Sequence, residues 1–155
     1  SVTGVQTCAL PIWKTYNLTT EPAYFKKPTR MKLHPDASKS FSIQSYSDEG
    51  VVVNGKLQTG PLLLCSIQGP KTWSAESFET LTQASFDELL AFTPELIIFG
   101  SGAKIKFPHP KLIATLMNQR IGVETMDTPA ACRTYNILAG EGRHVVGAFL
   151  IETTS

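Results

Sequence analysis

The stretch from Glu95 to Arg143 constrains the fold of this chain more than any other part of its sequence. Two apolar segments, Leu96–Phe99 and Val123–Met126, are each followed by a turn and then by a helical pattern. A continuous apolar run that stops at Gly100 is typical of a strand buried on both faces of a sheet. Strands that alternate with helices at this spacing predict right-handed β-α-β crossovers and parallel pairing.

Helix starts can be placed from local capping chemistry. Ser85 and Glu88 have the spacing of a capping box, which predicts a short helix after Ser85. Pro110 suits the first turn of the next helix. Thr128 is the expected N-cap of a further helix that spans about Pro129–Ala139.

The first part of the chain has the pattern of an antiparallel sheet. Phe41–Ser45 alternates apolar and polar residues, as a half-buried strand does. Val51–Val53 runs into Asn54 and Gly55, the residue pair that favours a type I′ hairpin turn. Leu62–Ile67 is expected to continue this meander. We therefore predict an α/β domain in which an antiparallel N-terminal sheet precedes a β-α-β-α-β unit with parallel pairing.

The N-terminal residues are expected to lie outside this domain. Val2–Ile12 matches the in-frame translation of a common sequencing-adapter oligonucleotide, so we expect that residues 1–12 were never selected to fold. Residues 13–40 are polar, contain several prolines and are predicted to form an irregular arm. The predicted domain spans residues 41–151.

Composition narrows the class of protein. The 155 residues carry 14 basic and 13 acidic side chains, so no electrostatic footprint for nucleic acid stands out. Cys65 and Cys132 both lie in apolar segments, which suits a reducing compartment. No apolar run approaches the roughly 20 residues that span a membrane. These features predict a soluble, cytoplasmic protein.

Gly100, Ser101 and Gly102 form a turn in which backbone N–H groups could approach an anion or a substrate. The turn is not a dinucleotide fingerprint, because Ile105 stands where the third glycine would be. The alternative is a tight exit from a buried strand.

Polar residues also gather where the helix after Val123–Met126 begins. The helix dipole could lower the pKa of the Cys132 thiol, or Cys132 could simply be a small buried side chain. Arg133 and Asn136 share one helical face. Arg133 could bind an anion or carboxylate, or it could form an ion pair with Asp127 or Glu124.

Two kinds of site are disfavoured. Ser101, His109 and Asp127 could in principle form a nucleophilic triad, but the G-x-S-x-G motif is absent. His34, His109 and His144 show no metal-ligand spacing with one another or with the cysteines. We predict no catalytic residue, no metal and no cofactor.

Several motifs together resemble the domain-of-unknown-function family 498, over residues Phe41–Ile151. The matching segments are Gly100–Gly102, Phe107–Pro110, Gly122–Glu124, Met126–Thr128, Ala130–Leu138 and Glu141–Arg143. The resemblance is to a free-standing bacterial member. It implies the methanogen 938-like fold with three layers, β/β/α, and the family also includes a mitochondrial complex I assembly factor.

The resemblance implies that the Gly100 turn and the segment Asp127–Asn136 form one surface. The mitochondrial member of the family acts through protein contacts, so the resemblance implies a non-catalytic binding or assembly module with a protein partner. The candidate binding residues are Gly100, Ser101, Gly102, Asp127, Thr128, Cys132, Arg133 and Asn136. The alternative is an enzyme or small-anion-binding protein that uses the Gly100 turn together with Cys132 and Arg133.

Overall fold

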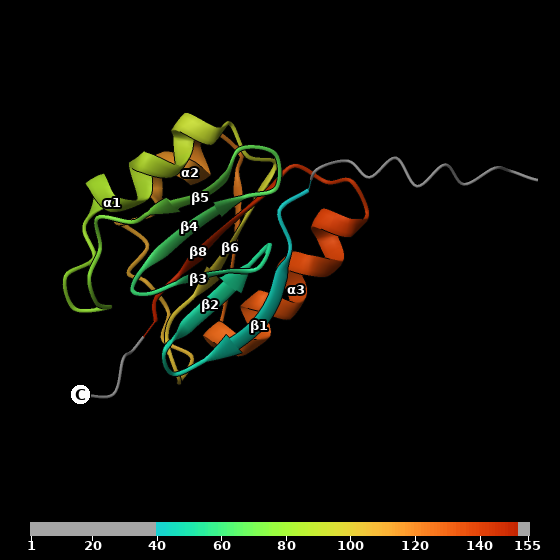
Figure 1. Cartoon of the computed structure of the whole chain (residues 1–155). Coiled ribbons are helices and arrows are strands. Elements are labelled where there is room, and N and C mark those ends of the chain that lie inside the picture. Colours follow the sequence, from blue (N-terminus) through green and yellow to red (C-terminus); the bar gives the residue numbers. More distant parts are fainter. Residues whose placement is uncertain (1–39, 152–155) are drawn as a thin grey trace, which may run out of the picture. The chain divides into compact units, whose positions relative to one another are not determined.

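The computed structural model of the chain describes residues 40–151, which belong to one compact unit (Figure 1). The predictions for residues 1–12 and for the arm up to residue 39 fall outside this range. The strands are β1 (Ile43–Ser47), β2 (Gly50–Val53), β3 (Lys56–Gln58), β4 (Leu62–Cys65), β5 (Gly69–Thr72), β6 (Leu96–Gly100), β7 (Gly122–Met126) and β8 (Val145–Phe149). The helices are α1 (Gln83–Asp87), the 3-10 helix η1 (Glu88–Phe92), α2 (Ala114–Asn118) and α3 (Thr128–Gly140).

The strands form two sheets. The small sheet is antiparallel, with the order β1-β2-β3, and the large five-stranded sheet has the order β5-β4-β8-β6-β7. Strands β6, β7 and β8 pair in parallel, whereas β4 is antiparallel to both β5 and β8. The predicted fold class is therefore confirmed: an antiparallel N-terminal sheet precedes a β-α-β-α-β unit with parallel pairing.

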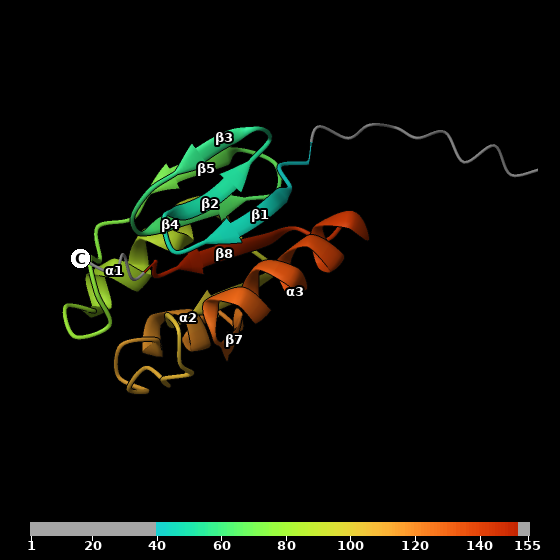
Figure 2. The same cartoon turned by 60° about the horizontal axis from the view of Figure 1, so that its bottom comes forward.

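The large sheet is the middle layer of the domain. One face packs against α1, η1 and α2, and the other packs against α3 and the small sheet (Figures 1 and 2). In β6, Ile97 and Phe99 belong to the first core and Ile98 to the second, as the alternation of side chains along a strand requires. Burial on both faces explains the continuous apolar run that β6 shows in the sequence.

The order of the strands explains why α2 and α3 lie on opposite faces. Helix α2 joins β6 to β7, and α3 joins β7 to β8 across the intervening β6. The two crossovers therefore run along the sheet in opposite directions. Because such crossovers share one right hand, they place their helices on opposite faces, and α3 lies beside the small sheet.

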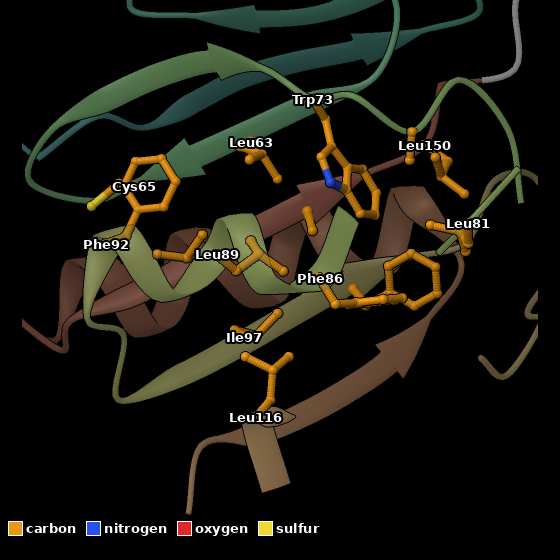
Figure 3. Packing of buried hydrophobic residues seen from close by; sticks show 14 residues of the cluster. Leu63, Cys65, Trp73, Leu81, Phe86, Leu89, Phe92, Ile97, Leu116 and Leu150 are labelled. Carbon is orange, nitrogen blue, oxygen red and sulfur yellow. The ribbon is translucent and has the colours of Figure 1, made fainter. Parts of the chain in front are cut away.

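Aromatic rings fill the core between the large sheet and its short helices (Figure 3). Trp73 and Phe86 meet edge to face with centroids 5.9 Å apart, and Phe99 of β6 meets Phe86 at 5.6 Å. The indole N–H of Trp73 donates to the carbonyl of Ser85 at 2.9 Å, so its polar atom is satisfied.

The predicted hairpin is correct. The prediction that Leu62–Ile67 continues the same antiparallel sheet is wrong. Asn54 and Gly55 have φ angles of 47° and 80°, as a type I′ turn needs, and they join β2 to β3. Strand β4 does not continue that sheet, because it pairs with β5 and β8 instead. All four β4 side chains, Leu62–Cys65, are buried, so the strand suits the interior of the large sheet.

Two predicted helix caps are also wrong. Helix α1 begins earlier than expected, because the Thr82 hydroxyl accepts from the N–H of Ser85 at 3.2 Å, and Ser85 lies inside the helix. In α3 the N-cap is Asp127, whose carboxylate accepts from Ala130 N at 2.7 Å. Aspartate is the better N-cap of the two residue types, and here the hydroxyl of Thr128 is engaged elsewhere.

Candidate functional site

The Gly100 turn lies at the end of β6, directly against the start of α3. A side chain at Gly100 would place its Cβ 3.0 Å from the Thr128 hydroxyl oxygen and 3.1 Å from Ala131 Cβ. A larger residue would force helix and strand apart by a few tenths of an ångström, so glycine suits their close approach. This agrees with the structural alternative, a tight exit from a buried strand.

Ser101 is fully buried, and its hydroxyl and its N–H both form hydrogen bonds within the protein. Its hydroxyl oxygen lies 2.9 Å from Lys104 O and 3.1 Å from Met126 O, to which it can donate, and it accepts from Lys106 N at 2.8 Å. Its own N–H donates to Met126 O at 3.0 Å. Ser101 thus fixes the loop that follows β6.

Gly102 and Thr128 complete this buried arrangement. The N–H of Thr128 donates to Gly102 O at 2.8 Å, and the N–H of Gly102 donates to the Thr128 hydroxyl at 3.0 Å. That hydroxyl donates in turn to Leu150 O at 2.7 Å. We call Gly100–Gly102 together with Asp127 and Thr128 the strand–helix junction. The N–H groups of Ser101, Gly102 and Thr128 are occupied, so they do not form an open cradle for an anion.

The remaining candidates lie farther along α3, beside β1. Asn136 makes two hydrogen bonds with the backbone of Ile43: its Oδ1 accepts from Ile43 N at 2.8 Å, and its Nδ2 donates to Ile43 O at 2.6 Å. The hydroxyl of Tyr135 donates to Phe41 O at 2.9 Å. The Asn136 side chain therefore pairs with the backbone of β1 as a neighbouring strand would, and it holds the edge of β1 against α3.

Tyr135 was not among the candidates, although it holds the same segment. Its ring is fully buried against Phe149, with centroids 6.0 Å apart, and burial raises the pKa of its hydroxyl. The hydroxyl of a buried tyrosine usually finds a hydrogen-bond partner. The position of Tyr135 among apolar residues of the helix could therefore have indicated its structural role from the sequence.

A groove of about 270 Å³ runs between β1 and the first turns of α3. It is lined by Ile43, Gln44, Ser45 and Tyr46 from β1 and by Pro129, Cys132, Arg133 and Asn136 from α3. The structure thus divides the candidates into two groups. The strand–helix junction is closed on itself, whereas Cys132, Arg133 and Asn136 meet in what we call the β1–α3 groove.

Arg133 is the exposed cation of this groove. Within residues 40–151 it forms no ion pair, so the predicted pairing with Asp127 or Glu124 is not found. The Asp127 carboxylate is engaged as the α3 cap instead. The guanidinium therefore remains available to an acidic group from outside the domain.

Cys132 is only 4% exposed. Burial raises the pKa of its thiol to about 12, although the neighbouring Arg133 charge lowers it in part. The thiol is therefore protonated at neutral pH, when it is a poor nucleophile. The helix dipole does not overcome the loss of hydration.

The triad considered from sequence is not assembled. Ser101 is fixed by backbone groups, Asp127 caps α3, and His109 Nδ1 accepts from Lys111 N at 3.2 Å. Among residues 40–151, no three or more His, Cys, Asp or Glu side chains are grouped so that they could hold a metal ion. The same part of the chain contains no helix that is long and apolar enough to cross a membrane.

Comparison with known proteins agrees with this architecture. Residues 43–150 match a family described as protein of unknown function (DUF498/DUF598). A curated relative from Bos taurus, named NADH dehydrogenase [ubiquinone] 1 alpha subcomplex assembly factor 3, is 36% identical over 121 residues, which are 77% of this chain and 65% of the relative. The chain thus spans slightly less than two thirds of that relative's length.

Two solved structures share the fold. A Bordetella parapertussis protein matches with a TM-score of 0.69 and 29% identity, covering 72% of this chain and 96% of that one. A Bordetella pertussis protein described as an Mth938-like domain matches with a TM-score of 0.68 and 26% identity, covering 81% and 95%. The methanogen 938-like fold expected from the sequence is confirmed.

Proposed function

We propose that this chain, which belongs to the DUF498/DUF598 family, is a non-catalytic binding module that assists the assembly of a protein complex. The names of its curated relatives support an assembly role, since several are called assembly factors. The specific complex is left open, because the chain matches only part of those relatives.

The observation that carries this proposal is the exposed Arg133 in the β1–α3 groove. A guanidinium that forms no ion pair within residues 40–151 can bind a carboxylate through two parallel hydrogen bonds. Gln44 and Ser45 are exposed on the facing strand and add donors and acceptors. Ile137, next to Arg133 on α3, is 62% exposed and offers an apolar contact. The groove therefore suits a protein segment that combines an acidic with an apolar side chain.

The competing enzyme class has less support. Its nucleophile candidates, Ser101 and Cys132, are both buried, and the Cys132 thiol is protonated at neutral pH. A cytoplasmic location remains part of the proposal. It is supported by Cys65 and Cys132, which are buried free thiols.

A photo-crosslinking amino acid at Ser45 would test this function in cells of the native host. We expect one dominant crosslinked protein, whose yield falls on the order of tenfold in an Arg133→Ser background, since one buried charged contact is lost. Lys71→Ser on β5 is the matched control and should leave the yield unchanged. Equal yields in the two backgrounds would exclude Arg133 from the contact.

A further inference from the structure

Charge is unevenly distributed along this nearly neutral chain. Between Glu95 and Glu124 the sequence contains no acidic residue. The same stretch contains the cations Lys104, Lys106, Lys111 and Arg120. A protein with 14 basic and 13 acidic side chains therefore has a local excess of positive charge around the loop that follows β6.

Large apolar side chains are exposed on that same loop. Ile105 is 51% exposed and Phe107 is 72% exposed, the highest value among the large hydrophobic residues of the described chain. Figure 2 shows the loop projecting at the end of the domain that carries α2 and β7. Single exposed apolar residues are common on protein surfaces, but two on a protruding basic loop form a distinct surface.

The loop is held in place from within. The buried Ser101 hydroxyl binds both Lys104 O and Lys106 N, which fixes the backbone immediately before Phe107. Lys106 forms an ion pair with Glu79 at 3.3 Å, and its ammonium lies 5.3 Å from the centre of the Phe78 ring. The exposure of Phe107 is thus a feature of a supported loop, and little conformational entropy is lost when a partner covers it.

We propose that the loop 103–111 docks on the surface of an anionic lipid bilayer. Ile105 and Phe107 enter the boundary between headgroups and acyl chains, where aromatic rings are favoured. Lys104 and Lys111, both exposed, lie at the level of the acidic headgroups. The contact is peripheral and separate from the β1–α3 groove.

The type of cation favours a bilayer over a protein partner. Lysine is depleted in the cores of protein interfaces, where arginine is preferred for its planar, directional donors. Mobile ammonium groups around a protruding apolar tip instead suit a diffuse layer of negative charge. An acidic protein surface is the competing occupant, and the experiment separates the two.

Phe107→Trp in the full chain places a fluorescent reporter at the tip. Its emission is compared in the presence of vesicles of pure phosphatidylcholine and of vesicles made from equal parts of phosphatidylcholine and phosphatidylglycerol. The parent chain, which contains Trp13 and Trp73, gives the background emission. We expect a blue shift with the anionic vesicles that weakens as salt is added. No shift with anionic vesicles, or a shift produced only by polyglutamate in solution, would overturn the proposal.

Vesicle co-sedimentation then assigns the residues. Combining Ile105→Ser with Phe107→Ser should reduce binding to anionic vesicles on the order of tenfold or more, because two apolar side chains are lost. Combining Lys104→Glu with Lys111→Glu should remove the preference for anionic over neutral vesicles.

The matched controls are Ile137→Ser on α3 and Lys56→Glu on β3, which should bind anionic vesicles as the parent chain does. Residues 14–39 also carry lysine and arginine. If binding through that segment dominates, it will survive both loop substitutions, and that result would overturn the role of the loop. Circular dichroism of each variant confirms that it is folded.

Discussion

Gly102 and Thr128 hold each other through a reciprocal pair of hydrogen bonds: Thr128 N donates to Gly102 O at 2.8 Å, and Gly102 N donates to the Thr128 hydroxyl at 3.0 Å. Residues 26 positions apart are thereby joined as closely as partners in a sheet. This pair couples the end of β6 to the start of α3. It gives the polar residues of this region a structural task, in agreement with the alternative of a tight exit from a buried strand.

Replacement of Thr128 should therefore destabilise the fold. Thr128→Val keeps the shape but leaves the N–H of Gly102 buried without a partner, which costs about 1–3 kcal/mol of unfolding free energy. Thr128→Ser keeps the hydroxyl and should cost less. Urea unfolding followed by circular dichroism measures both. Thr59→Val, at an exposed position, is the control and should change stability by less than about 0.5 kcal/mol.

Asn136 should prove to be a structural residue as well as a wall of the β1–α3 groove. Asn136→Leu removes both bonds to the Ile43 backbone, so we expect a loss of about 1–3 kcal/mol and faster hydrogen exchange of the Ile43 amide. Unchanged exchange at Ile43 would show that β1 does not depend on this side chain.

Asn136→Asp gives a test with a pH dependence. The carboxylate can still accept from Ile43 N but repels Ile43 O, so the folded state raises the pKa of the new carboxyl group. The deficit relative to the parent should be present at neutral pH. It should shrink as pH falls through that raised pKa, because a protonated carboxyl can donate to Ile43 O.

Cys132 should be inert in the native protein. Its 4% exposure and its pKa of about 12 predict slow alkylation by iodoacetamide at neutral pH and rapid alkylation after unfolding, with peptide mapping to separate it from Cys8 and Cys65. Cys132→Ser should cost stability, since a hydroxyl replaces a buried sulfur. Rapid native labelling of Cys132 would return the thiol to the list of functional groups.

The same thiol should make the domain less stable in alkali. In the unfolded chain it ionises near its ordinary pKa of 9.0, whereas in the fold it stays protonated until about pH 12. Between these values the unfolded state binds fewer protons, so the unfolding free energy falls as pH rises. In Cys132→Ala this contribution to the pH dependence of the unfolding free energy disappears. Urea midpoints measured as a function of pH should therefore show the difference in stability between the two proteins shrinking from pH 9.0 to about pH 12.

Deletion of residues 1–12 should leave the thermal midpoint essentially unchanged. The sequence of Val2–Ile12 matches an adapter translation and gives no reason for complementarity to the domain. Differential scanning calorimetry of the shortened chain checks this. A loss of several degrees, equivalent to about 1 kcal/mol, would show that the segment contributes to the fold.

The sequence was most informative where one local signal decided the structure. The apolar run of β6 and the Asn54-Gly55 turn both predicted their elements correctly, because burial on two faces and positive φ angles leave few alternatives. The sheet to which β4 belongs could not be predicted in this way. Its pairing with β8 joins residues that are far apart in the chain, and no local pattern reports such a partner.

The candidate site was harder to predict for the same reason. Asp127 and Thr128 are both good N-caps, and the choice depends on Gly102 and Leu150, which are distant in sequence. The sequence left open whether Arg133 binds an external acidic group or pairs with Asp127 or Glu124, and the groove beside it needs β1, which the sequence did not assign to that face. The sequence indicated which residues could cap a helix or bind a partner, but it did not indicate which distant residues they contact.

The central place of β8 in the large sheet limits how early the sheet can form while the chain is being synthesised. This strand is the last one among residues 40–151, yet it lies between β4 and β6 and joins the two halves of the sheet. Before Val145–Phe149 leaves the ribosome, β4 and β6 each present an open edge to other chains. The large sheet therefore cannot close until β8 has been synthesised, and such late, long-range pairing favours slow folding and exposes nascent chains to aggregation.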